Sequence, residues 1–208
     1  SARKYANKGI DLGKNIIVFT NNDYAYEAAI DLKLINNENK VTVVDIRNDS
    51  KGDLIKKAKT LGIKILFNHV VTNTKGRKRI NSVFVHKIDN ETNKIIDNYG
   101  KISCDILCVS GGWSPTVHLF TQSRGKLIFR ESDATFIPNE SFQNEISVGA
   151  CNGTYALEEI IEKIDNKMSN LLSSFKIDIK NNNHPSLNKI KKIFYDKMKH
   201  LWIIPSNI

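Results

Sequence analysis

The chain has 208 residues, and its 31 Lys and Arg outnumber its 22 Asp and Glu, which gives a formal net charge of +9. Hydrophobic residues make up 40% of the chain, so the composition excludes a disordered protein and allows a sizeable core. No apolar run approaches the ~20 residues that a membrane-spanning helix requires, and 3 cysteines do not make a disulfide framework.

The sequence also bears on location and partners. It lacks a secretion leader, so we expect a cytoplasmic protein without a membrane partner. It begins with Ser1, and residues 2–8 resemble the end of a helix, so we expect a part of a longer protein. Lys, Asn and Ile are frequent throughout, and this uniform enrichment accounts for the positive charge without a nucleic-acid partner.

The first part of the chain predicts alternating strands and helices. Residues 15–19 form an apolar run typical of a buried strand, residues 25–34 have apolar side chains at helical spacing, and residues 40–46 predict a second strand. A short helix at residues 53–61 and a strand at residues 63–67 extend this pattern. Such βαβ units have parallel strands and right-handed crossovers.

The apolar period then changes from 3.6 to 2, which indicates antiparallel strands. A further apolar strand is expected at residues 102–109, and the whole makes one α/β domain of about residues 12–114. The three strands of the expected meander are residues 70–74, 81–88 and 94–98.

The second part of the chain is richer in loops. Strand fragments are expected at residues 127–129 and 134–137, a short apolar strand at residues 146–149, and an amphipathic helix at residues 154–172. The C-terminal part is expected to hold a linker and a last lysine-rich helix, residues 173–183 and 187–201.

The first strand-to-helix turn departs from the dinucleotide-binding pattern. Residues 20–25 read Thr-Asn-Asn-Asp-Tyr-Ala where such a fold carries Gly-x-Gly-x-x-Gly. Thr20 and Asn22 replace the first two glycines, and their Cβ atoms would crowd a diphosphate bound to backbone N–H groups. The loop at Thr20, Asn21 and Asn22 therefore predicts either a modified nucleotide site or, as we favour, a scaffold that has lost its ligand.

Other polar residues give weaker signals. Asp45 ends the second strand where a ribose-binding acid would stand, and Arg47 could serve a 2′-phosphate. Without the glycines, we expect both to be solvated loop residues. Cys104 and Cys108 should point to one face of the strand at residues 102–109 as buried thiols. No metal-ligand spacing, nucleophile elbow or phosphate loop occurs, so we expect neither a catalytic residue nor a metal site.

Several stretches are more specific, and together they closely resemble the alpha subunit of heterotetrameric sarcosine oxidase. They are VFTNNDYAYEAA at residues 18–29, VSGGWSPTVHLFTQSRGKL at 109–127, SVGACNGTYAL at 147–157 and HLWIIP at 200–205. The resemblance covers nearly the whole chain but only the middle of a much longer subunit.

The resemblance implies a scaffold like that of the pyridine nucleotide-disulfide reductases. Residues 1–114 would be an inserted, degenerate dinucleotide-binding-like domain, and residues 115–172 the C-terminal half of an outer NAD-binding domain. Residues 173–208 would lead to a folate-binding, aminomethyltransferase-like region. The expected fold class is thus α/β, with a Rossmann-like parallel βαβαβ unit plus an antiparallel meander, and part of a second FAD/NAD-binding-like domain.

It also implies where a cofactor would bind. In related flavoproteins a Gly-Asp pair at a helix start touches the cofactor, and the equivalent residues 149–153 read Gly-Ala-Cys-Asn-Gly. The acid is missing but Asn152 can hydrogen-bond, which disfavours FAD and favours an NAD half-site here. FAD and FMN would then serve elsewhere in the complex. The residues implied are Gly111, Gly112, Trp113, Gly149, Ala150, Asn152 and Gly153.

The activity implied is the oxidation of sarcosine to glycine, with the one-carbon unit passed to tetrahydrofolate and the electrons to O2. The partners implied are beta, gamma and delta subunits, and the amine oxidation belongs to the beta subunit. We expect this chain to be an inactive support piece. The alternatives are a related amine dehydrogenase or disulfide-reductase-like flavoprotein, and a basic, non-enzymatic module that uses the turn Lys75-Gly-Arg-Lys-Arg79.

Overall fold

The computed structural model describes residues 1–48, 51–89, 91–92 and 94–176. The predicted C-terminal helix and most of the predicted linker before it lie outside these residues. The chain divides between Gly112 and Trp113 into two compact units. Unit 1 begins at Ser1 and unit 2 begins at Trp113.

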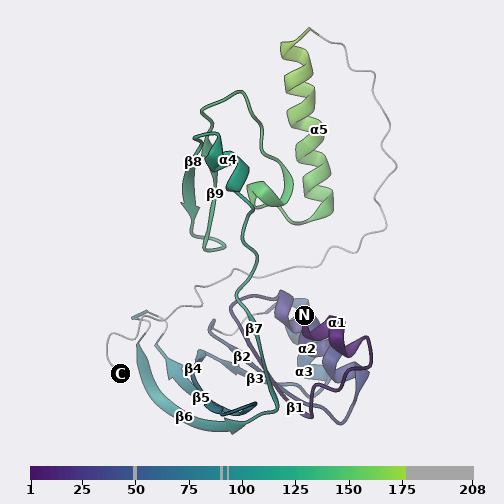
Figure 1. Cartoon of the computed structure of the whole chain (residues 1–208), viewed down its shortest axis with the longest axis vertical. Coiled ribbons are helices and arrows are strands. Elements are labelled where there is room, and N and C mark those ends of the chain that lie inside the picture. Colours follow the sequence, from purple (N-terminus) through teal and green to yellow (C-terminus); the bar gives the residue numbers. More distant parts are fainter. Residues whose placement is uncertain (49–50, 90, 93, 177–208) are drawn as a thin grey trace. The chain divides into compact units, whose positions relative to one another are not determined.

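Unit 1 is built on a parallel sheet with the strand order β3-β2-β1-β7. Its strands are β1 (Asn15–Thr20), β2 (Lys40–Asp45), β3 (Lys64–Phe67) and β7 (Ile106–Ser110). Three helices accompany them, α1 (Ala2–Ala6), α2 (Tyr24–Ile35) and α3 (Asp53–Thr60). The helices lie together on one face of the sheet (Figure 1).

The continuous apolar runs of β1 and β2 are explained by burial on both faces. Ile16 and Val18 pack with the helices, whereas Ile17 and Phe19 pack against the opposite layer. That layer is an antiparallel meander of β4 (His69–Gly76), β5 (Ile80–Ile88) and β6 (Ile95–Ser103). The predicted fold class, a parallel α/β unit with an antiparallel meander, is therefore confirmed (Figure 1).

The strand predicted at residues 102–109 is wrong in its extent. Residues 102 and 103 complete β6, and β7 begins only at Ile106. Asp105 separates them, because its Oδ2 accepts hydrogen bonds from the backbone N–H groups of Lys14 and Asn15 at 2.9 and 2.7 Å. This carboxylate clamps the start of β7 to the start of β1.

The two nearby cysteines consequently do not share one face. Cys104 packs in the cluster under the meander, and Cys108 on β7 packs against the helix side. Burial raises the pKa of both thiols, so both are poorer nucleophiles than a free cysteine.

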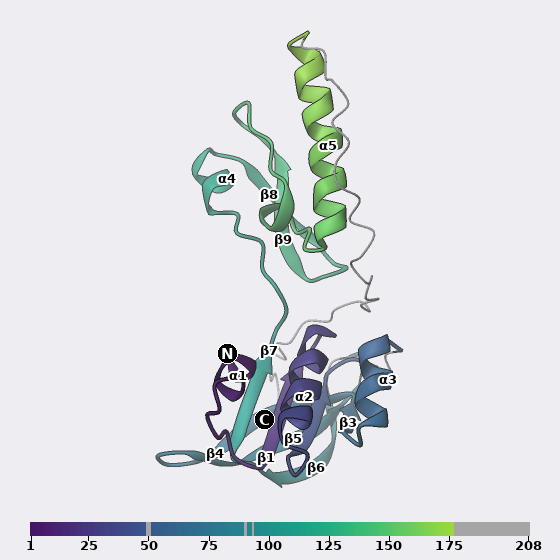
Figure 2. The same cartoon turned by 90° about the vertical axis from the view of Figure 1, so that its right-hand side faces the viewer.

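Unit 2 is smaller and has little core. It holds α4 (His118–Gln122), the hairpin of β8 (Lys126–Arg130) and β9 (Thr135–Glu140), a 3-10 turn at Gly149–Asn152, and α5 (Leu157–Ser174) (Figure 2). The strand predicted at residues 146–149 is wrong, because no described residue pairs with it in a ladder. The predicted apolar stripe of α5 is largely uncovered, with Leu157 49% and Met168 44% exposed.

No helix in the described ranges is long and apolar enough to cross a membrane.

Candidate functional site

The candidate site of unit 1 lies at the carboxyl edge of the parallel sheet, where open α/β sheets bind their ligands. Thr20 at the end of β1 is in register with Asp45 on β2 and with Ser110 on β7. The other predicted loop residues, Asn21 and Asn22, follow Thr20 directly, and Asp23 occupies the N-cap position of α2 without a side-chain capping hydrogen bond. The fold therefore brings the loop at residues 20–22 and Asp45 together at one edge of the sheet.

The loop is filled by its own side chains. Thr20 Oγ1 accepts the Asn22 backbone N–H at 3.1 Å, and its hydroxyl lies 3.2 Å from the Ser110 carbonyl oxygen. Asn22 Nδ2 donates to Asn21 Oδ1 at 2.7 Å and to the Ser110 carbonyl at 3.1 Å. Asn21 Nδ2 in turn donates to the Gly111 carbonyl at 3.3 Å. Thr20, Asn21 and Asn22 are all buried, with at most 3% of each residue exposed.

Asp45 and Arg47 are buried, so the expectation that both are solvated is wrong. Arg47 donates from Nη2 to Asp45 Oδ2 at 2.8 Å and to Asp23 Oδ1 at 2.7 Å. Its Nε and its backbone N–H both reach Asp45 Oδ1 at 3.0 Å. Tyr26 donates its hydroxyl to Asp45 Oδ2 at 2.8 Å. The four side chains form a closed network between β2 and the start of α2.

Part of this network could have been found in the sequence. Asp23 and Tyr26 are three positions apart, so their side chains share one side of the helix start. The missing information was that Arg47 folds back toward them, because this depends on how the end of β2 lies beside α2.

The pKa values of two members of the network, Arg47 and Tyr26, are shifted by their surroundings. Burial disfavours the charged form of Arg47, but hydrogen bonds and charges from Asp45 and Asp23 outweigh it, so the pKa of Arg47 is raised. Burial, with the charge of Asp45 and its hydrogen bond, raises the pKa of Tyr26 far above the ordinary 10.0. A cationic guanidinium and a neutral phenol therefore surround the Asp45 carboxylate.

These residues do not fit a dinucleotide. A ribose needs a free carboxylate to accept its hydroxyl protons, whereas each Asp45 oxygen already accepts two hydrogen bonds. Within the described chain the buried Asn22 Oδ1 has no hydrogen-bond partner. A diphosphate is itself an acceptor and could not satisfy that oxygen.

The second candidate site is the turn Gly149–Asn152 of unit 2 and the glycine that follows it. Gly149 has φ +81° and Gly153 has φ +66°, conformations that favour glycine. A Cβ at Gly153 would lie 2.5 Å from Arg130 Nη2, which donates to the Gly153 carbonyl at 2.8 Å. The Asn152 side chain is half-buried and has no hydrogen bond within the described part of the chain. The role of Asn152 in holding a cofactor stays a prediction.

The remaining predicted residues lie at the boundary between the two units. Gly111 and Gly112 are exposed, and Gly112 has φ +93°. Trp113 is 54% exposed, and its ring centroid lies 6.1 Å from that of Tyr155 within unit 2. Gly111 contributes its carbonyl to the Asn21 side chain, as described above. The described residues contain no group of three or more His, Cys, Asp or Glu that could hold a metal ion.

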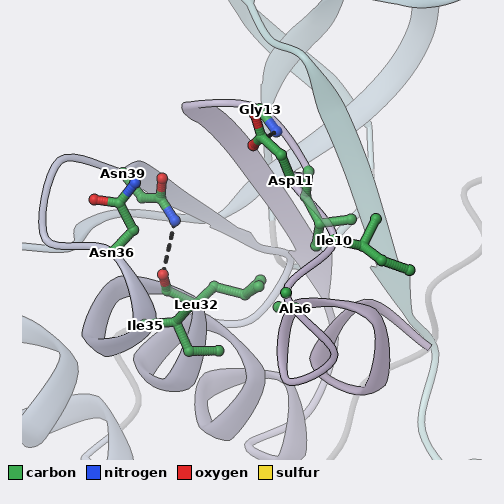
Figure 3. Close-up of a pocket in the computed structure, with 10 residues that line it drawn as sticks. Ala6, Ile10, Asp11, Gly13, Leu32, Ile35, Asn36 and Asn39 are labelled. Carbon is green, nitrogen blue, oxygen red and sulfur yellow. Dashed lines mark hydrogen bonds between the residues drawn. The ribbon is translucent and has the colours of Figure 1, made fainter.

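A pocket of about 190 Å³ lies at the opposite edge of the sheet (Figure 3). Its polar side chains have partners, since Asp11 Oδ1 accepts from the Gly13 N–H and Asn39 Nδ2 donates to the Leu32 carbonyl, both at 2.8 Å. Because ligands of such sheets bind at the carboxyl edge, this pocket is not the candidate site. Its apolar lining comes mainly from Ala6, Ile10, Leu32 and Ile35.

The fold and the loop at residues 20–22 together define a Rossmann-like α/β protein. At the carboxyl edge of its sheet, where such folds bind dinucleotides, the chain's own side chains fill the loop. Comparison with known proteins then narrows the class. The chain is 32% identical over 156 residues to sarcosine oxidase subunit alpha of Corynebacterium sp. (strain U-96). It is 28% identical over 158 residues to that of Corynebacterium sp. (strain P-1) and 29% over 154 residues to that of Rhizobium meliloti (strain 1021). The predicted resemblance to sarcosine oxidase alpha subunits is therefore confirmed.

The matched region is most of this chain but a small part of the relatives. It covers 74% of the chain and 16% of each Corynebacterium subunit. No family model matches the chain. Among solved structures, T. acidophilum thioredoxin reductase matches with a TM-score of 0.46 and 16% identity, over 67% of this chain and 48% of its own. L-proline dehydrogenase from P. horikoshii matches with a TM-score of 0.44 and 18% identity, over 86% and 30%.

Proposed function

We propose that the chain is a central part of a sarcosine-oxidase-type alpha subunit, and that unit 1 is a nucleotide-binding scaffold that works without a nucleotide. The Arg47 guanidinium supports this more than any other observation. It supplies from within the chain the hydrogen bonds that a ribose would otherwise give to Asp45. Unit 1 would thus serve as architecture that supports neighbouring parts of the subunit.

Unit 2 would supply half of an NAD-binding domain. In this proposal Gly149, Ala150, Asn152 and Gly153 contact NAD, and the segment Gly111 to Trp113 carries the chain into that domain. The exposed apolar stripe of α5 supports the idea, because a helix of a dinucleotide fold packs that stripe on a sheet. Residues 115–172 would be the C-terminal half of this outer domain, and the folate-binding region would follow residue 208.

The chemistry would occur in other parts of the complex. The whole complex would oxidise the CH–NH bond of sarcosine to give glycine, with FAD and FMN as further cofactors. It would pass the one-carbon unit to tetrahydrofolate and the electrons to O2, in the cytoplasm and with beta, gamma and delta subunits. No residue described above has the environment of a general base or nucleophile for that step, so the chain by itself would not turn over sarcosine.

Isothermal titration calorimetry of NAD+ into the 208-residue chain tests this proposal. We expect weak binding, with a dissociation constant on the order of 1 mM, because only half of a site is present. Asn152→Ala should abolish this binding, and Asn144→Ala, a change of an exposed residue in the same unit, should leave it unchanged.

The loop of unit 1 is tested by the same titration. Asn21→Ala and Thr20→Val should leave the affinity for NAD+ unchanged. Tight, saturable binding that either change removes would show that the loop holds the nucleotide, and the proposal for unit 1 would then be wrong.

A further inference from the structure

The arginines of this chain differ in whether another side chain of the chain pairs with them. The chain has six arginines among its 31 basic residues. Acidic side chains hold Arg3, Arg47 and Arg130. Arg124 lies 5.4 Å from the centre of the Phe142 ring. Arg77 and Arg79 alone have no such partner within the described ranges.

Both of these arginines lie at the turn between the end of β4 at Gly76 and the start of β5 at Ile80. The turn requires glycine at position 76, because Gly76 has φ +150° and a Cβ there would lie 2.0 Å from the Arg79 carbonyl oxygen. Ile80 pairs with Gly76 and closes the ladder. Every residue from Lys75 to Arg79 is exposed. The fold therefore presents the two guanidinium groups on an exposed turn.

The charge of this hairpin has one sign. Residues 69–88 contain five Lys and Arg and no Asp or Glu. The neighbouring strand adds the exposed Lys101, which pairs with Phe84. Asn73 also pairs with Phe84, so Lys101 and Lys75 lie on the same face of the meander. We call the set Lys75, Arg77, Lys78, Arg79 and Lys101 the basic tip.

We propose that the basic tip docks on an acidic protein surface, with Arg77 and Arg79 each pairing with carboxylates of the partner. This goes beyond the proposed function, because it stands on the charges of unit 1 and not on the oxidase assignment. Guanidinium groups form bidentate pairs with carboxylates, and unpaired surface charges steer and select partners. Of the other four arginines, Arg3, Arg47 and Arg130 already form ion pairs with acidic side chains of the described chain.

The surroundings of the tip favour a protein over other polyanions. Single-stranded RNA readers stack several bases on exposed aromatic rings. The face that carries Lys75 and Lys101 has one aromatic ring beside them, that of Phe84, and it is half-buried. Membrane-surface segments bury exposed apolar side chains in the lipid, and the tip has none between Lys75 and Arg79. Four of the five residues of the basic tip lie within residues 75–79, and the fifth, Lys101, lies on β6, so the charge is concentrated at the turn.

Binding of three probes by fluorescence anisotropy tests the proposal with the whole chain at about 0.15 M salt. The probes are poly-L-glutamate, a single-stranded RNA oligonucleotide and vesicles that contain phosphatidylserine. For Arg77→Glu with Arg79→Glu we expect an affinity for poly-L-glutamate about tenfold lower. The conservative pair Arg77→Lys with Arg79→Lys keeps the charge and should weaken binding about threefold, because it removes bidentate pairing.

The matched control is Lys8→Glu with Lys57→Glu, which makes the same charge change at two exposed positions of unit 1. It should alter the affinity less than about twofold. Equal weakening by control and tip variants would reduce the effect to net charge and overturn the proposal. Tighter binding of RNA or vesicles than of poly-L-glutamate, lost in the tip variant, would assign the tip to that polyanion instead.

Discussion

At the scale of single residues, Arg47 differs most from what its sequence position indicated. A residue that the sequence placed in solvent is held by two carboxylates, and its side chain is only 7% exposed. The replacement of glycines by Thr20 and Asn22 was readable from the sequence, and the crowding of a diphosphate by their Cβ atoms stays a prediction. The contact between Arg47 and Asp23 was not readable, because it joins residues 24 positions apart across two elements.

Tyr26 makes the network sensitive to alkaline pH. Its pKa is raised in the folded state, so the stability that its neutral phenol provides is present below pH 10.0 and lost as the pH rises further. Above pH 10 the unfolded chain loses this proton and the folded chain keeps it. We expect the free energy of unfolding to fall by up to about 1.4 kcal/mol per pH unit from this group.

Urea unfolding between pH 9 and pH 11.5 measures this effect. Tyr26→Phe should make the decline with pH shallower by about that amount, although the variant is about 1 kcal/mol less stable at neutral pH because the hydrogen bond to Asp45 is lost. Tyr5→Phe, at a residue 52% exposed, is the control and should keep the original slope. An unchanged slope in Tyr26→Phe would show that the phenol does not stay neutral in the fold.

At the scale of elements, the start of β1 depends on Asp105 and Gly13. The strand periods were predicted correctly, but the polar residue that separates β6 from β7 was taken for part of one strand. Its role is visible only when β7 lies beside β1, since Asp105 accepts hydrogen bonds from residues about 90 positions earlier. The same carboxylate leaves no room for a side chain at Gly13, where a Cβ would lie 2.4 Å from Asp105 Cβ.

Alanine substitutions at two glycines test this clamp. Gly9 and Gly13 both have positive φ, +75° and +89°, but a Cβ at Gly9 meets nothing within 4 Å. Gly9→Ala should therefore cost about 1 kcal/mol of stability from backbone strain alone. Gly13→Ala should cost about 2 kcal/mol more, because Asp105 must move and release its hydrogen bonds. Equal losses in thermal denaturation would mean that the clamp contributes nothing.

At the scale of the whole molecule, the two units differ in how much core they have. Among the described residues, Phe120 is the sole buried hydrophobic residue of unit 2, whereas both core clusters consist of unit 1 residues. A piece with so little buried apolar surface is marginal on its own. Unit 1 encloses the parallel sheet between helices and meander and has what an independent domain needs.

Expressing the two parts separately tests this difference. Residues 1–112 should unfold in one cooperative transition in urea, monitored by circular dichroism. Residues 113–176 should show no cooperative transition and should bind a hydrophobic dye, because α5 has no sheet to cover its stripe. A cooperative transition of the second fragment would contradict the view that it is half of a domain.

The order and kind of most elements followed from local patterns, because the spacing of apolar residues reflects the helix and strand periods wherever a segment packs. The motifs also pointed correctly to the relatives. Three-dimensional packing was needed to place Asp45 and Arg47, since a charged side chain is buried only if another part of the fold brings it a partner. It was needed also for the exposed Asp105, because its partners Lys14 and Asn15 come from the start of β1. It was needed equally for residues 146–149, because a strand exists only where a neighbouring strand takes its hydrogen bonds.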